Sequence, residues 1–463
     1  MKHILSLSFI FLFFIIYFYT TFYKKYYKYN LIFLQNSKKL IKETKGYFKE
    51  NLLQPPIIPI KNMVKLKLPI NIKSSPIILI PDICGSKLYY KNKLKLNLNW
   101  KKIWFNINYF FPQTKKSNDW KYKIKPILVN HMLSNQKNIL ISPYRESNYK
   151  GNIFNITRDY GGIEGITFFQ KIGNSILYEF DPLIQFLIQN CNYKSANNLF
   201  AASYDFRLIS NKNNLHFFFK KLKDLIEYSY YNNNDKSFIV ASGLGGILFI
   251  LFINYYLPKE LGNNHYLIWK KKFIKTFLPI NTPFIGCMSA MRALLFGING
   301  GIGLKTLIYK NVKWYHDFQQ YIGGLLFLLP DADLFKINLP YIKINNNFIK
   351  NLMKYRLIDP GIPTIAIVSS NFKKKTLMHY KKKIHEKFFY TELYSNVPSN
   401  PVLTILRNNT DLFKMVGDSI SPFISQQVPI LWSNSKIHRL NNDHRSIFNN
   451  KKFLKLFCQI ILK

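Results

Sequence analysis

The chain has 463 residues, of which 48% are hydrophobic, so it can bury a sizeable core and is not globally disordered. Lysine and arginine total 66 against 23 aspartates and glutamates, a formal net charge of +43 at pH 7. The lysines are scattered along the chain, which disfavours a dedicated nucleic-acid site but favours attraction to anionic membrane surfaces. The four cysteines are far apart without a CxxC motif, which excludes a metal knuckle or a dense disulfide framework and leaves one or two disulfides open.

The N-terminus carries a long apolar stretch. Residues 4–23 are 20 residues without a charge, followed by lysines and no small-x-small cleavage site. This length can span a bilayer, so residues 1–30 are predicted to be a signal anchor, with a cleaved signal peptide as the alternative. Either segment sends the chain into the secretory pathway, as a membrane-anchored or a secreted or lumenal protein. The Lys-rich residues 31–73 are interpreted as a basic tether.

Short apolar runs and one glycine-rich turn indicate the fold of the remaining chain. Lysines between apolar residues at helical spacing predict an amphipathic helix over 215–229. A glycine-rich turn at 243–246 leads into an apolar helix that runs up to Pro258 and, over 245–256, is too short to span a membrane. Buried strands are predicted at 76–81, 237–241, 274–279 and 364–369. Together these elements predict an open α/β fold with mostly parallel strands, and the aperiodic stretch 293–362 is interpreted as an inserted cap.

The strand, turn and helix around residue 243 have the setting of a nucleophile elbow, G-x-S-x-G. Such a turn lifts its central side chain above the sheet, and small residues on both sides let strand and helix pack closely. Ala241 and Gly245 are the small residues here, and the central residue is Gly243, where a serine is expected. Glycine relieves the backbone strain but provides no oxygen nucleophile.

An acid and a histidine follow the turn in the order that this fold uses for a triad. Asp418 lies in MVGDSIS and His444 in NNDHRSIF. His444 precedes an apolar helical tail, so we expect it at the N-terminal edge of the last helix. Opposite a well-placed aspartate, such a histidine is a candidate general base.

From about residue 74 onward the chain resembles the lecithin:cholesterol acyltransferase family of α/β-hydrolases, which includes lysosomal phospholipases and phospholipid:diacylglycerol acyltransferases. The resemblance rests on several short segments in the family's order. They are IILIPDICGSKL (77–88), IWFNINYFFP (103–112), ASYDFRL (202–208), FIVASGLGGILFIL (238–251), INTPFIGCMSAMRALLFGINGGIG (280–303), LLP (328–330), Gly417–Asp418 and 444–450.

The resemblance implies an α/β-hydrolase domain over 74–463, acting on glycerophospholipid esters through a serine esterase mechanism without cofactor or metal. Position by position, Gly243 stands at the nucleophile, Asp418 at the acid and His444 at the base. The backbone N–H groups of Ile83 and Leu244 would form the oxyanion hole. The implied partners are phospholipid and a membrane surface, together with an acyl acceptor that the sequence does not identify.

The chain departs from the family's pattern at several positions. The nucleophilic serine is absent, and the family's Pro-Gly in the first loop is Pro81-Asp82, which places a charge beside the proposed oxyanion hole. The membrane-contacting excursion, about 91–122, is shorter and lacks the two cysteines that close it in the family. Two roles are open for the aromatic residues of this excursion, contact with lipid or packing in the core. The residues are Trp104, Phe105, Phe110 and Phe111.

Two functional hypotheses follow. The first is a lipid O-acyltransferase or phospholipase of this family; the second is a pseudoenzyme that keeps the fold and serves as a lipid-binding or membrane-associated scaffold protein. Catalysis would require a substitute nucleophile, and the candidates are Ser242, Cys84, Cys287 and a water activated by His444. Ser242 is adjacent to the elbow, but its side chain is expected to point away from the base.

Overall fold

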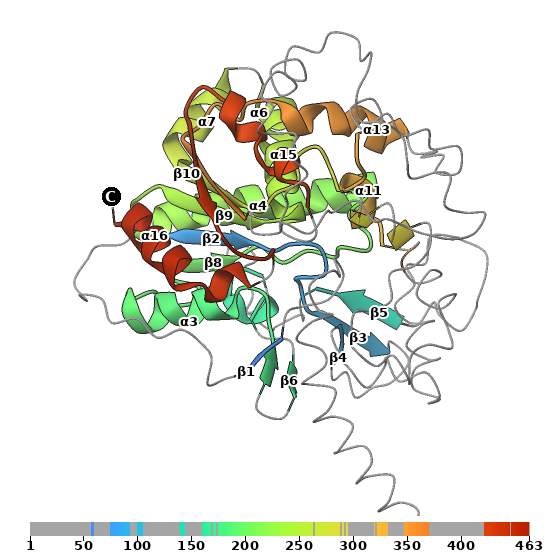
Figure 1. Cartoon of the computed structure of the whole chain (residues 1–463). Coiled ribbons are helices and arrows are strands. Elements are labelled where there is room, and N and C mark those ends of the chain that lie inside the picture. Colours follow the sequence, from blue (N-terminus) through green and yellow to red (C-terminus); the bar gives the residue numbers. More distant parts are fainter. Residues whose placement is uncertain are drawn as a thin grey trace, which may run out of the picture.

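The structure is a computed structural model of the chain (Figure 1). Everything said below concerns the residues that the structure describes. These are residues 57–59, 75–92, 100–104, 139–143, 160–167, 170–172, 175–262, 264–287, 289–290, 293–294, 319, 322–331, 347–369, 421–444 and 446–462.

A six-stranded sheet forms the centre of the fold, and all of its neighbouring strands are parallel. The predicted α/β class with a mostly parallel sheet is therefore confirmed. Four strands coincide with the predicted apolar runs, whereas β8 and β12 were not predicted. In spatial order the strands are β12 (Ser435–Leu440), β11 (Thr364–Ser369), β10 (Ile274–Ile280), β9 (Ser237–Ser242), β2 (Ile77–Ile80) and β8 (Leu199–Ala201).

Helices cover both faces of this sheet (Figure 1). Side chains alternate along a strand, so Ile78 and Ile80 of β2 pack on one face while Ile77 and Leu79 pack on the other. The first face is covered by α4 (Lys212–Asn233) and α5 (Leu244–Leu251), and the second by α3 (Asp181–Asn190) and α16 (Lys451–Ile461). Burial on both faces explains why the central strands are continuous apolar runs.

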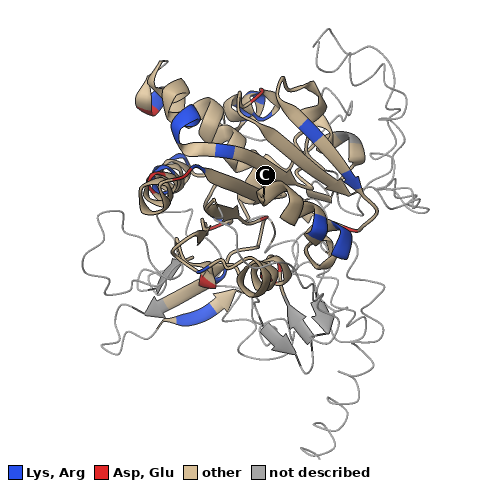
Figure 2. Ribbon diagram, turned by 90° about the vertical axis from the view of Figure 1, so that its left-hand side faces the viewer, with Lys and Arg blue, Asp and Glu red and all other residues tan. Residues whose placement is uncertain are grey.

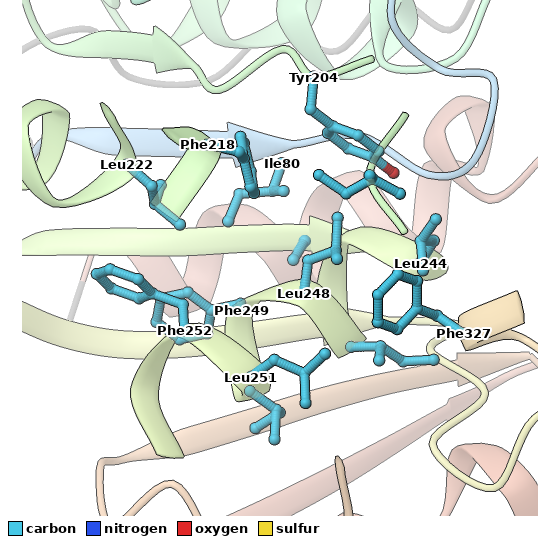
Figure 3. Close-up of a cluster of buried hydrophobic side chains, with 14 of the residues drawn as sticks. Ile80, Tyr204, Phe218, Leu222, Leu244, Leu248, Phe249, Leu251, Phe252 and Phe327 are labelled. Atoms are coloured by element: carbon cyan, nitrogen blue, oxygen red, sulfur yellow. The ribbon is translucent and has the colours of Figure 1, made fainter. Parts of the chain in front are cut away.

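The apolar helix after the glycine turn is longer than expected and lies in the core. α5 continues through a π-helical segment, η6 (Phe252–Tyr256), into α6 (Leu257–Leu261). Figure 3 shows Leu244, Leu248 and Phe252 within a buried cluster that also contains Phe218 and Leu222 of α4. Leu244–Leu261 is long and apolar enough to cross a membrane, but 72% of it is buried inside the protein, where it packs in the core.

Two small antiparallel sheets accompany the central one. One joins β1 (Ile57–Pro59), β7 (Ser175–Leu177) and β6 (Gln170–Ile172), and the other joins β4 (Lys101–Trp104), β3 (Leu88–Asn92) and β5 (Ile139–Ser142). The remaining elements are η5 (Ile163–Gly165), α7 (His265–Phe273), α11 (Gly324–Phe327), α13 (Asn347–Met353), η7 (Lys354–Leu357), α15 (Phe423–Gln426), η9 (Val428–Leu431) and η10 (Ile447–Asn449).

The predicted domain boundaries fall mostly on residues outside those described. The segment 1–30 lies entirely outside them, and of 31–73 only 57–59 is described. Parts of the predicted excursion (91–122) and cap (293–362) are described, and α11 and α13 of the latter pack on the main core. The boundaries stay predictions.

Candidate active site

The turn between β9 and α5 has the geometry of a nucleophile elbow with a glycine at its centre. Gly243 has φ +47° and ψ −117°, a conformation that side-chain-bearing L residues rarely adopt. Its N–H donates to the carbonyl of Ile280 on β10 at 3.0 Å, which holds the turn at the end of the sheet. A Cβ on Gly245 would lie 2.5 Å from the Ile80 carbonyl oxygen, so helix and strand approach too closely for any side chain there.

The carboxylate of Asp82, the second residue after β2, lies directly over this turn. Its Oδ1 accepts from the backbone N–H of Ile83 at 2.7 Å and from that of Leu244 at 2.6 Å. Its Oδ2 is 3.3 Å from Nε2 of His444. Asp82 therefore binds both N–H groups proposed for the oxyanion hole and the ring nitrogen proposed as general base.

The same carboxylate occupies the space of the missing nucleophile. A Cβ built on Gly243 would lie 2.0 Å from Oδ1 and 2.1 Å from Cγ of Asp82. These separations are far below van der Waals contact, so a side chain at position 243 and Asp82 in this conformation exclude each other. Glycine at 243 and aspartate at 82 are complementary in shape.

The loop that carries Asp82 is fixed by polar contacts from three directions. The N–H of Asp82 donates to Oε1 of Glu179 at 2.6 Å, and the hydroxyl of Tyr204 donates to the carbonyl of Pro81 at 3.0 Å. The indole N–H of Trp104 donates to the carbonyl of Cys84, which has a left-handed φ of +64°. Burial, and then the negative charges of Asp82 and Glu179, raise the pKa of Tyr204 well above its ordinary value, so Tyr204 stays a neutral donor.

His444 is held by its backbone as well as by its ring. It lies in the turn between β12 and η10 with its side chain 4% exposed, and α16 begins only at Lys451, after the intervening η10. The expected position at the edge of the last helix is therefore corrected by several residues. The amide nitrogen of Asn281 donates to the carbonyl of His444 at 2.9 Å, and the Asn281 oxygen accepts from the N–H of Ser369 at 2.9 Å.

The other residues singled out from the sequence are not all brought together. Asp418, Phe105, Phe110 and Phe111 lie outside the described residues. Ser242 ends β9 and is 5% exposed, and Cys84 and Cys287 are buried in the main core. Trp104 is 1% exposed and packs edge-on against Phe206, which corresponds to the core alternative rather than to lipid contact.

The sequence indicated the charge of Asp82 beside the proposed oxyanion hole but not that its side chain accepts from both N–H groups proposed to form it. It also missed Glu179 and Asn281. Asn281 stands in the INTPFIG segment, where an Asn before Thr-Pro is a turn signal; its φ is +49°. Nothing local in the sequence around Glu179 indicates its contact with Asp82. Within the described part of the chain, no group of three or more His, Cys, Asp or Glu side chains is arranged to hold a metal ion.

Comparison with known proteins shows which protein family this chain is similar to. The family model for lecithin:cholesterol acyltransferase matches residues 100–409. Phosphatidylcholine-sterol acyltransferase from Mus musculus is 27% identical over 247 residues, which cover 51% of this chain and 49% of that protein. Lecithin-cholesterol acyltransferase-like 1 from Arabidopsis thaliana is 27% identical over 135 residues, covering 27% of this chain and 28% of that one.

The chain thus spans at most about half the length of these curated relatives. Among solved structures, one described as the crystal structure of the Tle4-Tli4 complex aligns with a TM-score of 0.46 and 11% identity. That alignment covers 84% of this chain and 98% of the other.

Proposed function

Because the chain belongs to the lecithin:cholesterol acyltransferase family, we propose that it binds glycerophospholipid at a membrane surface and has lost the serine ester chemistry of an acyltransferase or phospholipase. The observation that carries the proposal is the position of Asp82. Its carboxylate takes the place of the attacking oxygen and binds both N–H groups that would stabilise a tetrahedral intermediate. A pseudoenzyme of this kind is a lipid-binding or scaffold protein of the secretory pathway, brought there by residues 1–30.

Two separate defects support the loss of ester chemistry. Gly243 offers no nucleophile, and losing a triad member removes most of the rate of such an enzyme. An ester carbonyl also finds no donor at Ile83 or Leu244 while Asp82 accepts from both. An anionic carboxylate in the hole repels the negative charge that develops on an ester oxygen.

The second candidate is acyl transfer or phospholipid hydrolysis itself, as the family's name describes. The position of His444 favours it, because its Nε2 lies 3.3 Å from the Asp82 carboxylate that fills the space above Gly243, where a general base would act. Asp82 would have to leave the hole, and the attacking oxygen would come from Ser242 or from water. The burial of Ser242 at the end of β9 supports water over Ser242.

The test uses the full chain in detergent, mixed with vesicles of phosphatidylcholine alone or with an anionic phospholipid. Flotation measures binding, and release of labelled fatty acid or its transfer to a sterol measures turnover. We expect binding without turnover and no labelling by a fluorophosphonate. Turnover that is abolished by His444→Gln but left intact by Glu260→Gln, a change at an exposed carboxylate on α6, would establish the second candidate. If the chain bound neither type of vesicle, the proposal would be contradicted.

A further inference from the structure

Three exposed apolar side chains lie together where α4 ends and α7 runs. Tyr231, in the last turn of α4, is 61% exposed, and Leu267 and Ile268 of α7 are 43% and 63% exposed. Lys272 connects the two helices, because its Nζ donates to the hydroxyl of Tyr231 at 3.3 Å and Ile268 lies one helical turn before it. With the exposed Lys271, these residues form one surface, called the α7 patch below.

The charge of the α7 patch is positive. Its two lysines are exposed, and α7 contains no acidic residue. The acidic side chains on the neighbouring helices have partners of their own. Glu227 of α4 accepts from the indole N–H of Trp269 at 2.6 Å, and Glu260 of α6 interacts with Tyr256. Exposed apolar groups are therefore combined with basic groups that α7 itself does not neutralise.

The α7 patch lies at the end of the central sheet opposite to the candidate active site. α7 ends at Phe273, and β10 begins at the next residue, Ile274, which pairs with Ser237 at the start of β9. Gly243 follows the other end of β9 and donates to Ile280, the last residue of β10. The six residues of β9 separate the two ends by roughly 20 Å, at about 3.3 Å per residue. Figure 1 shows α7 well apart from α11, which packs near the turn at the site.

We infer that the α7 patch is the surface through which this protein contacts an anionic lipid bilayer, with the candidate active site facing away from the membrane. Apolar side chains gain free energy on entering the boundary between headgroups and acyl chains, and a tyrosine ring suits that boundary because one end is polar. The flanking lysines extend to the anionic headgroups. The inference rests on the proposed membrane binding and adds the surface and the orientation.

This orientation agrees with the loss of ester chemistry. A phospholipid in the contacted leaflet is roughly 20 Å from the turn at Gly243, the length of the strand that separates the two ends. The membrane would then hold the protein without presenting an ester to the site, as a scaffold requires.

The experiment measures which lysines a membrane protects. The full chain is mixed with vesicles of phosphatidylcholine and phosphatidylserine, flotation confirms binding, and a short pulse of N-hydroxysuccinimide acetate acetylates accessible amines. Mass spectrometry of peptides gives the rate at each lysine. Acetylation of Lys271 and Lys272 should slow at least about 5-fold on vesicles, since an attraction of about 1 kcal/mol per lysine favours the headgroup-bound amine by that factor. The control is Lys212, exposed at the start of α4, whose rate should stay unchanged.

Matched serine variants test the apolar part of the patch without altering charge. The double variant Leu267→Ser/Ile268→Ser should remove the protection of the two lysines. Phe217→Ser changes a ring that is 52% exposed on the same helix as Tyr231 but roughly 20 Å along it, and should leave the protection intact. All three positions are exposed, and circular dichroism checks that the variants keep the fold.

Three results would overturn the inference. Protection of Lys212 in place of Lys271 and Lys272 would mean that the other end of the sheet faces the membrane. Protection of Lys271 and Lys272 without vesicles would mean that protein, from this chain or a second copy, covers the patch. Full protection in the double serine variant would mean that the apolar side chains take no part.

Flotation distinguishes failure of this inference from failure of the proposed function. A chain that binds neither type of vesicle contradicts both. A chain that binds vesicles while Lys271 and Lys272 react at their free rates contradicts the α7 patch alone.

Discussion

At the scale of single residues, Gly243 and Asp82 must be considered as a pair. The space that a serine side chain would fill is taken by the Asp82 carboxyl, 2.0 Å from the site of a Cβ on Gly243. In the pattern that the resemblance implies, the first position is a serine and the second a glycine, so both members of the pair differ here. Restoring one residue without the other leaves the site either overcrowded or without a nucleophile.

We therefore expect Gly243→Ser alone to be silent in a fatty-acid release assay with phospholipid vesicles. Combined with Asp82→Gly, it should release fatty acid at least about 100-fold faster, because the oxyanion hole and the serine become available together. Adding His444→Gln to this double variant is the control and should remove the gain. Equal activity of the single and double variants would show that Asp82 does not obstruct the site.

Asn281 is a second residue whose importance only the contacts reveal. It is 1% exposed, adopts a φ of +49° and connects the His444 carbonyl to the N–H of Ser369. Asn281→Ala removes the donor to the buried His444 carbonyl, leaves the Ser369 N–H with its longer 3.3 Å contact to Oε1 of Gln426, and places alanine in a left-handed conformation. The free energy of unfolding should fall by about 2–4 kcal/mol, measured by urea denaturation.

Asn281→Gly separates the two contributions. Glycine loses the same hydrogen bonds but accepts the positive φ, so it should be more stable than Asn281→Ala by about 1 kcal/mol. If alanine proved as stable as asparagine, the hydrogen bonds to His444 and Ser369 would contribute nothing to stability.

At the scale of elements, the C-terminal helix illustrates how local signals and packing agree. The Asn450 side chain caps α16 by accepting from the N–H groups of Lys452 and Phe453. One face of the helix, with Leu454 and Phe457, is buried against the sheet on the same side as α3. His444 lies just ahead of this helix, so the docking of α16 also restricts the candidate base.

Leu454→Ala should lower the free energy of unfolding by about 2–5 kcal/mol, the usual cost of a buried leucine. The neighbouring Lys455 is exposed on the same helix, and Lys455→Ala should change stability by less than about 0.5 kcal/mol. Thermal or urea unfolding of the two variants provides the comparison. Similar losses for both would mean that α16 is not anchored through this face.

The elements that the sequence did not predict are the two edge strands. β12 has the sequence SKIHRL, whose polar residues do not form an apolar run, and β8 has only three residues. An edge strand is stabilised by pairing with one neighbour, here β11 or β2, and such long-range pairing leaves little trace in local sequence.

At the scale of the whole molecule, the dominant property is charge. Figure 2 shows lysine and arginine on several separate helices and strands of the described residues, rather than gathered on a single element. This distribution agrees with solvated faces and with a general attraction to anionic surfaces, which needs no specific pocket.

The full chain should therefore bind vesicles containing anionic phospholipid more tightly than vesicles of phosphatidylcholine alone, and salt should weaken the difference. The Debye length falls from about 10 Å at 0.1 M to about 3 Å at 1 M salt, which screens scattered surface charges strongly. Flotation of vesicles across this salt range measures the effect. A preference for anionic lipid that persists unchanged at 1 M would instead indicate a defined headgroup site.

The sequence by itself determined the α/β class, four of the six central strands and the elbow at Gly243. These features are local, because a strand buried on both faces must be an apolar run and a sharp strand-to-helix turn needs small residues. Only the tertiary structure decided what fills the space above Gly243. Asp82 and His444 are far from Gly243 in the chain. Their meeting there depends on β2 and β9 being neighbours in one parallel sheet and on the turn after β12, the edge strand on the far side of β10 and β11, reaching the same end of that sheet.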